Sequence, residues 1–199
     1  MTREKTLEVF RKANALLTGH FLLTSGKHSS IYLEKFAVLQ DPKATQALCK
    51  EIAAHFKPKK IDVVIGAAVG GIILAFETAK HLGVRGIFME REEGKLKLRR
   101  GFEVKEGERV LIVEDIVTTG GSVRELIEEL KATCKCEIAG VGLLIDRSGK
   151  KIDFGEGETY ALAEVDVTAY EEKDCPECKK GAPLTKRGSR KIKKAKTEN

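Results

Sequence analysis

The 199-residue chain contains no apolar run near the roughly 20 residues that a membrane-spanning helix needs. Residues 1–10 carry charges of both signs and no apolar stretch, so they do not resemble a secretion signal. The five cysteines are an odd number in a chain long enough to build a hydrophobic core, which argues against a disulfide framework. These absences predict a cytoplasmic protein with no membrane contact.

Negative charge is missing from most of the C-terminal end. Residues 179–196 hold nine lysines and arginines and no acid, whereas residues 1–178 hold 27 basic and 29 acidic residues. We interpret residues 179–199 as a basic, solvated tail. The alternative is a contact with nucleic acid, which we do not expect because the tail lacks the interleaved aromatic residues of a single-strand platform.

Short apolar runs alternate with helical patterns through the middle of the chain. Runs buried on both faces of a parallel sheet have this appearance, so we predict an α/β fold with a central parallel sheet flanked by helices. The expected strands are 61–65, 84–89, 109–113, 138–145 and 159–165, and the expected helices between them are 71–82 and 122–132.

Smaller elements are predicted at both ends of this core. The spacing of apolar residues predicts a helix over 6–17, followed by two short strands at 20–24 and 30–35. Asp41-Pro42 is a good helix start, and this helix should run to about residue 56. We therefore predict a single domain over 1–178. Its core spans about 40–167, and small flanking elements lie at about 1–40 and 167–178.

The most informative segment is Val110-Leu111-Ile112-Val113-Glu114-Asp115-Ile116-Val117-Thr118-Thr119-Gly120-Gly121-Ser122. An apolar strand runs into two acids, then into small residues that open a helix. Free backbone N–H groups at a helix N-terminus bind anions, and glycines let the backbone approach closely. The preceding carboxylates can accept hydrogen bonds from a diol. The segment therefore predicts a cradle for a phosphorylated sugar such as ribose 5-phosphate.

This cradle differs from two better-known phosphate loops. The Gly-Lys-Ser/Thr ending of a nucleoside-triphosphate loop is missing, and the dinucleotide fingerprint has no acidic pair before its glycines. Two more loops fall at the same predicted sheet edge. Residues 66–71 are small and can turn sharply. Residues 90–100 contain five basic residues and predict an exposed, mobile loop that can close over an anion, with a solvated hairpin as the alternative.

Residues 110–122 resemble the 5-phosphoribosyl 1-pyrophosphate (PRPP) motif of the type I phosphoribosyltransferases. The resemblance implies that Glu114 and Asp115 hold the ribose hydroxyls and that the cradle holds the 5-phosphate. It also implies that Ala68, Val69 and Gly70 grip the pyrophosphate. The implied PRPP-binding set is Arg91, Lys95, Lys97, Glu114, Asp115, Ile116, Val117, Thr118, Thr119, Gly120, Gly121 and Ser122.

A second resemblance concerns the acceptor. The segment 21–32 is similar to the N-terminal signature of the orotate phosphoribosyltransferases, in which it forms part of a hood over the base. Asp146-Arg147 matches that family's Asp-Arg pair, and the end segment from Cys175 to Arg190 is similar to one bacterial branch. The resemblance implies orotate binding by Arg147 and Thr118, because a guanidinium pairs well with a carboxylate.

The same resemblance implies the reaction and its helpers. It implies transfer of the phosphoribosyl group to orotate in pyrimidine biosynthesis, with Lys95 and Asp115 as catalytic residues and Mg²⁺ as the cofactor. No protein side chain is expected to be an obligatory metal ligand. Family members are homodimers, so residues 91–97 are expected to complete the neighbouring subunit's site. The loop cations differ from the common pattern at Glu92 and Lys97.

The cysteines and histidines leave several readings open. Cys134, Cys136, Cys175 and Cys178 can supply four thiolates to zinc, 175 and 178 can form a redox pair, or all can stay reduced. No histidine has ligand spacing, so we expect His20, His28, His55 and His81 to be surface or hydrogen-bonded residues. His28 falls in the expected hood.

Two other functions remain as alternatives. One is a phosphoribosyltransferase for a purine base, which the hood signature and Arg147 argue against. The other is a PRPP sensor without catalysis that would use the basic tail. The presence of Lys95, and the absence of an N-terminal DNA-reading domain, argue against it.

Overall fold

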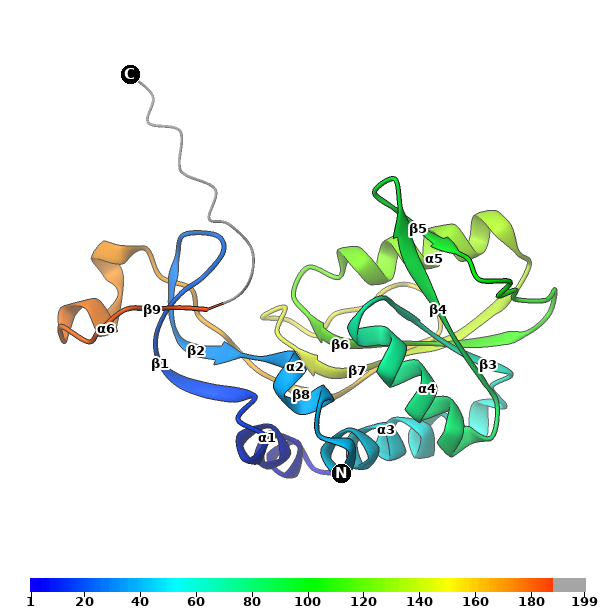
Figure 1. The fold of residues 1–199 in the computed structure, drawn as a ribbon, viewed down its shortest axis with the longest axis horizontal. Helices are drawn as coiled ribbons and strands as arrows, with labels where there is room; N and C mark the ends of the chain where they lie inside the picture. The colour runs from blue at the N-terminus through cyan, green and yellow to red at the C-terminus, as the bar shows by residue number, and fades with distance from the viewer. Residues whose placement is uncertain (188–199) are drawn as a thin grey trace, which may run out of the picture.

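The computed structural model describes residues 1–187 as a twisted, mostly parallel sheet with helices on both faces and a small second sheet at one side (Figure 1). The main sheet has the order β5-β4-β3-β6-β7-β8, and only β5 runs antiparallel to its neighbour. Its strands are β3 (Val63–Ala67), β4 (Arg85–Glu92), β5 (Lys95–Leu98), β6 (Arg109–Val117), β7 (Glu137–Asp146) and β8 (Glu158–Glu164). The predicted fold class is therefore confirmed.

Helices cover the two faces of this sheet unequally. The helices are α1 (Arg3–Lys12), α2 (Lys35–Leu39), α3 (Pro42–Phe56), α4 (Gly70–Leu82), α5 (Gly121–Thr133) and α6 (Pro176–Lys179), with short 3-10 turns at Lys57–Lys59 and Glu172–Asp174. One apolar cluster joins α1, α3 and α4 to one face, and a second joins α5 to the other (Figure 1). Side chains from both faces of the sheet are thus removed from water.

Local signals explain several of these elements. The side chain of Asp41 accepts hydrogen bonds from the N–H groups of Lys43 and Ala44, as expected for the cap of α3. α3 packs closely on β7, where a β-carbon at Gly140 would overlap the ring of Phe56. The close packing of helix on strand therefore requires glycine at that position.

The N- and C-terminal segments form the second sheet, which we call the hood. It has the order β2-β1-β9, with strands β1 (Leu16–Leu22), β2 (His28–Leu33) and β9 (Thr185–Lys186). β9 runs parallel to β1, so the hood continues beyond the predicted limit at residue 178. The remainder of the predicted tail, 188–199, lies outside the described residues.

The prediction of a helix over 6–17 was wrong at its C-terminal end. α1 ends at Lys12, and Asn14 takes a positive φ of 53°. Leu16 and Leu17 begin β1 instead. Their apolar side chains continued the helical spacing only by coincidence, because the same residues also suit a half-buried strand.

The segment 90–100 forms a β-hairpin, the alternative to a mobile loop that the sequence left open. β4 and β5 pair antiparallel from Met89 to Leu98, and the turn lies at Glu93-Gly94. The hairpin rests on α5, where Glu125 accepts a hydrogen bond from the N–H of Leu96. The buried side chain of Leu96 and the acidic side chains of α5 therefore both hold the hairpin against the sheet.

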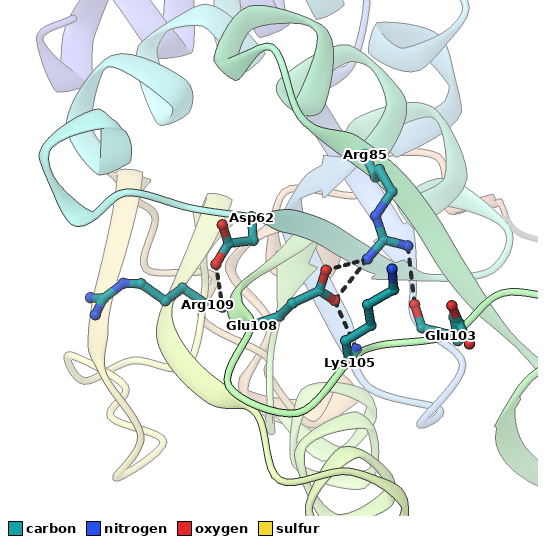
Figure 2. A network of polar contacts seen from close by, with 6 residues as sticks. All are labelled: Asp62, Arg85, Glu103, Lys105, Glu108 and Arg109. Atoms are coloured by element: carbon teal, nitrogen blue, oxygen red, sulfur yellow. Dashed lines mark hydrogen bonds and ion pairs between the residues drawn. The ribbon is translucent and has the colours of Figure 1, made fainter.

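A polar network fixes the opposite end of the sheet, where β3, β4 and β6 begin (Figure 2). Arg85 binds both carboxylate oxygens of Glu108 at 2.7 Å and also donates to the carbonyl of Glu103. Asp62 accepts a hydrogen bond from the N–H of Arg109. The network orders the loop that leads into β6, the strand that carries the two acids.

The helices of the described range are all too short or too polar to cross a membrane.

Candidate active site

The predicted phosphate cradle lies where β6 passes into α5. Gly120 is the N-cap of α5 and takes a left-handed conformation with φ of 78°, which favours glycine. A β-carbon there would also come within 2.8 Å of Phe154. A pocket of about 610 Å³ opens over the turn. It is lined by Arg91, Glu114, Ile116, Val117, Thr118, Thr119, Gly120, Gly121, Ser122, Val123 and Glu125.

Both acids lie inside β6 rather than after it, because the strand continues to Val117. Glu114 is 8% exposed and Asp115 is 2% exposed. Burial, followed by repulsion from the neighbouring Asp115 carboxylate, raises the pKa of Glu114 to about 7. Two adjacent buried acids are expensive unless something pairs with them, so the site is built to receive hydrogen-bond donors or cations.

Lys35 supplies part of that compensation. Its Nζ lies 3.0 Å from Asp115 Oδ2 and 3.2 Å from Oδ1. Within the described range, Oδ2 forms no hydrogen bond of good geometry. Gly70 faces the same oxygen, and a β-carbon at Gly70 would overlap it. Asp115 Oδ2 therefore lies between the Lys35 ammonium and the 68–70 loop, in which the Ala68–Val69 peptide bond is cis.

A second pocket, of about 730 Å³, lies beside the cradle and under the hood. Ile116 borders both pockets. The second pocket is lined by Thr24, Tyr32, Leu33, Glu34, Lys35, Phe36, Ala68, Val69, Asp115, Ile116 and Arg147. Its walls thus come from the hood, the 68–70 loop, β6 and the end of β7, and they carry both aromatic and charged groups.

Arg147 is held at the rim of this second pocket by its backbone. Its N–H donates to the carbonyl of Val117 at 2.8 Å. Asp146, which is buried, accepts hydrogen bonds from the N–H groups of Ser148 and Ile152 and so closes the following turn. The Nε of Arg147 finds no partner among residues 1–187, and burial lowers the pKa of the guanidinium. This half-buried cation is available to an anionic ligand.

The three predicted loop cations lie on the β4–β5 hairpin, but only Arg91 lines the cradle pocket. Arg91 forms a two-pronged ion pair with Glu125, and this pairing lowers the pKa of the Glu125 carboxyl. Lys97 Nζ lies 3.0 Å from Glu129. Lys95 is exposed at the beginning of β5 and lines neither pocket.

The other predicted site residues divide between the two pockets. Residues 118–122 line the cradle, and Thr118 is not among the residues that line the second pocket. Ala68 and Val69 face the second pocket. Sequence reasoning missed Lys35 and Glu125. Lys35 could have been suspected on chemical grounds, because a buried acid such as Asp115 needs a cation nearby.

The structure narrows the readings of the cysteines and histidines. His20 and His28 are buried, at 5% and 4% exposure, and lie beside Cys175 and Cys178. Within the described range, the cluster of possible metal ligands contains these four residues and neither Cys134 nor Cys136. The four-thiolate arrangement is therefore not assembled.

Comparison with known proteins places this site in a family context. Residues 37–156 match the family model for the phosphoribosyl transferase domain. The matched range includes the cradle, the 68–70 loop, the hairpin and Arg147, and leaves out the hood. Residues 37–156 make up more than half of the chain.

Full-length relatives extend the likeness to the hood. The chain is 52% identical over 192 residues to the orotate phosphoribosyltransferase of Caldanaerobacter subterraneus subsp. tengcongensis, which covers 96% of this chain and all of that relative. It is 51% identical over 192 residues, with the same coverage, to the orotate phosphoribosyltransferase of Pelotomaculum thermopropionicum.

Solved structures show the same architecture. The orotate phosphoribosyltransferase of Aeropyrum pernix has a TM-score of 0.64 and 26% identity, covering 79% of this chain and 92% of its own. The adenine phosphoribosyltransferase of Saccharomyces cerevisiae has a TM-score of 0.61 at 17% identity, covering 78% and 99%, which is a likeness of fold alone.

Proposed function

This chain belongs to the phosphoribosyl transferase family, and within it to the orotate phosphoribosyltransferases, and from this premise we propose how its two pockets share the substrates. The reaction transfers the 5-phosphoribosyl group of PRPP to orotate. It gives orotidine 5′-monophosphate and pyrophosphate, in pyrimidine biosynthesis. The observation that best supports the proposed arrangement is a phosphate cradle and a pocket with an available arginine on either side of Ile116.

PRPP occupies the cradle in this proposal. Residues 118–122 bind the 5-phosphate through the free N–H groups of α5 and through hydroxyl groups. Glu114 and Asp115 accept hydrogen bonds from the two ribose hydroxyls, which offsets the cost of burying the two acids. The pyrophosphate lies toward Ala68, Val69 and Gly70, whose loop borders the second pocket beside Lys35.

Orotate occupies the pocket under the hood. The Arg147 guanidinium pairs with the orotate carboxylate, and the pocket's aromatic lining residues, Tyr32 and Phe36, offer apolar surface to the planar ring. Thr118 lies in the adjoining cradle and contacts orotate only if the base reaches past Ile116. A base without an anionic group would leave the buried guanidinium unpaired, which disfavours adenine or hypoxanthine.

The chemistry requires no protein nucleophile. The bond between the ribose C1 and the pyrophosphate oxygen breaks, a bond from C1 to N1 of orotate forms, and the proton that N1 carried passes to the departing pyrophosphate. The electron pair of the broken bond leaves with pyrophosphate. Positive charge develops on the sugar as this happens, and the Asp115 carboxylate holds the adjacent hydroxyls in place. The hood excludes water, which would otherwise compete with orotate for C1.

Magnesium fits this site. Two adjacent buried carboxylates with Lys35 as the one cation close to them in the described range keep an excess of negative charge, which suits a hard cation surrounded by oxygen atoms. Asp115 and Glu114 would hold it through the ribose hydroxyls, without either carboxylate being an obligatory ligand. When bound, the ion would neutralise charge on the departing pyrophosphate.

The leaving pyrophosphate needs further cations, which we assign to the β4–β5 hairpin. Arg91 is already at the edge of the cradle, whereas Lys95 and Lys97 are directed elsewhere within their own chain. We assign Lys95 to the site of a second subunit in a homodimer, where it pairs with pyrophosphate. A cytoplasmic location suits a substrate pair of small anions.

The decisive experiment follows the absorbance of orotate with PRPP and magnesium, for wild type and for Lys95→Ala. We expect turnover in the wild type and a fall in kcat of roughly 100-fold or more in the variant, with little change in KM, because Lys95 acts mainly in the transition state. Lys105→Ala is the matched control, since Lys105 lies at the opposite end of the sheet (Figure 2).

Mixing subunits tests the assignment to the partner's site. A heterodimer of Lys95→Ala and inactive Asp115→Asn chains has one intact site if Lys95 acts across the dimer, and none if it acts within its own chain. Absence of recovered activity would place Lys95 in its own subunit's site. Wild-type turnover with adenine and none with orotate would overturn the acceptor.

A further inference from the structure

Four side chains from distant parts of the sequence meet inside the hood. His20 lies on β1, His28 begins β2, and Cys175 and Cys178 flank the start of α6. One nitrogen or sulfur atom from each lies within 4.8 Å of all the others. Both histidines and Cys175 are buried, and Cys178 is half-buried. Such a set of groups is unusual for a plain hydrophobic contact and is typical of a metal site.

The separations between these atoms are close to those of a zinc tetrahedron. With Zn–N bonds of about 2.0–2.1 Å and Zn–S bonds of about 2.3 Å, tetrahedral ligand atoms are roughly 3.3–3.8 Å apart. His20 Nε2 lies 3.6 Å from Cys175 Sγ and 3.5 Å from Cys178 Sγ. His28 Nδ1 lies 3.1 Å from Cys178 Sγ and 2.9 Å from His20 Nε2. If the shorter of these separations increased by a few tenths of an ångström, the four atoms would have the spacing of zinc ligands.

The hydrogen bond on the far side of His20 prepares the ring for this role. Its Nδ1 lies 2.8 Å from the carbonyl oxygen of Ala182, and only a protonated Nδ1 can donate there. In the neutral ring this leaves the lone pair on Nε2, the nitrogen that faces the two sulfurs. Metal-binding histidines typically donate their other N–H to a carbonyl in this way, which fixes the ring and its tautomer.

The surrounding segment needs an anchor that its own apolar residues do not provide. Of residues 166–187, only Cys175 is buried. Its other attachments include a two-way backbone bridge between His28 and Tyr170, an exposed ion pair between Lys27 and Glu171, and β9, which pairs with β1. A short, polar segment of this kind gains its order from a cross-link or a metal rather than from a core.

We propose that His20, His28, Cys175 and Cys178 bind one zinc ion, which fastens the C-terminal segment to the β1–β2 hairpin. Two thiolates and two imidazoles favour zinc over the hard cations that prefer oxygen ligands. Four protein ligands leave no open position, so the ion is structural and takes no part in the reaction. The zinc site is separate from the cradle, and the zinc proposal does not depend on the substrate assignments above.

The first experiment measures zinc per chain in tag-free protein produced with zinc in the medium and freed of loose metal by gel filtration. We expect about one zinc per chain in the wild type, as for closed four-ligand sites, and close to none in Cys175→Ser/Cys178→Ser. Cys134→Ser/Cys136→Ser is the matched control. It also removes two neighbouring sulfurs, which lie 3.1 Å apart, but leaves the four proposed ligands in place. It should keep its zinc.

A second measurement needs no variant. Wild-type protein refolded with cobalt should show thiolate charge-transfer bands and the strong visible bands of tetrahedral cobalt. Zinc removal by a chelator should make the segment 166–187 the first site of cleavage in limited proteolysis, and added zinc should restore protection. Therefore the inference remains testable if Cys175→Ser/Cys178→Ser fails to fold.

Three results would overturn the inference. The first is wild-type protein that holds less than about a tenth of a zinc per chain after refolding with zinc. The second is equal zinc loss in both double variants. The third is a Cys175–Cys178 disulfide in freshly purified protein, shown by mass spectrometry as the loss of two hydrogens without bound metal.

Discussion

Lys35 and Asp115 form an ion pair that joins the start of α2 to β6, with Lys35 Nζ 3.0 Å from Asp115 Oδ2. The two partners are unequally buried, because the Lys35 side chain is 38% exposed and the Asp115 side chain 2%. The Lys35 charge also acts to lower the pKa of the adjacent Glu114. Lys35 therefore helps to keep two buried acids ready for a sugar diol, in addition to lining the second pocket.

Replacing Lys35 should weaken PRPP binding more than it weakens the fold. In Lys35→Ala the Asp115 carboxylate loses its cation, so we expect PRPP affinity to fall roughly tenfold, the equivalent of about 1.4 kcal/mol. Stability should fall by only about 1 kcal/mol, since Lys35 is partly exposed and the pair is screened by water. Calorimetric titration with PRPP and magnesium, together with urea unfolding, measures the two quantities.

Lys43→Ala is the control for Lys35→Ala, because Lys43 is an exposed lysine on α3. A double-mutant cycle with Asp115→Asn isolates the pair, and the two substitutions should be strongly non-additive. Additive effects on PRPP affinity would mean that Lys35 acts without Asp115.

Replacement by alanine should destabilise the protein at Gly120 and have little effect at Gly121. Gly120→Ala forces a side chain into a left-handed conformation and against Phe154, so we expect a loss of about 1–3 kcal/mol in the free energy of unfolding. At Gly121 a β-carbon meets only Thr119 Oγ1, at 3.7 Å, and alanine should change stability by less than about 1 kcal/mol. Urea unfolding of the two variants tests this, and equal losses would contradict the described turn.

Arg147 should distinguish the two substrates. In Arg147→Ala an anionic acceptor loses a charge-assisted hydrogen bond worth about 2 kcal/mol, so KM for orotate should rise roughly thirtyfold. KM for PRPP should change by less than about threefold, because Arg147 does not line the cradle. Arg11→Ala, an exposed arginine on α1 paired only with Glu4 in the described range, is the control. A larger rise in KM for PRPP than for orotate would mean that Arg147 acts on PRPP and not on orotate.

The parts of the fold that could be predicted from the sequence are those that depend on residues close together in the chain. The run from Val110 to Ser122 carries its strand, acids and helix start in one stretch, so the cradle followed directly from residue order. The cap at Asp41 was predictable for the same reason. The acids themselves proved to lie within the strand, because β6 continues to Val117 along β7.

Contacts between distant segments were not predictable in this way. His20 and Cys178 are 158 positions apart, and no spacing rule connects a hairpin to a helix start that far along the chain. The sequence could not decide between a loop and a hairpin at 90–100, because the partners of this segment, Glu125 and Glu129, belong to α5. Charged residues indicate exposure when read alone, and they indicate an attachment only when the opposite charge is known to face them.

Glu114 should make the stability of the ligand-free protein depend on pH. Its folded pKa is about 7, against 4.5 for an ordinary glutamate. Between these values the folded protein holds a proton that the unfolded chain releases, so the free energy of unfolding falls as pH rises. The contribution is fully present below about pH 4.5 and is lost as pH rises through about 7. Glu114→Gln has no such proton. Between about pH 5 and about pH 8, its free energy of unfolding should therefore fall by less than that of the wild type, with a difference on the order of 1–3 kcal/mol.

Urea unfolding of wild type and Glu114→Gln at several pH values measures this difference. The amide in Glu114→Gln keeps a side-chain oxygen that can accept the N–H of Asp115, so the substitution changes charge with little change in shape. Glu106→Gln removes a carboxylate that is 77% exposed, and its pH profile should follow the wild type because water already solvates that charge. Parallel profiles for wild type and Glu114→Gln would mean that the Glu114 carboxyl is ionised in the folded protein at low pH. Water or a cation would then already compensate the acids, and the diol of PRPP would not be needed to do so.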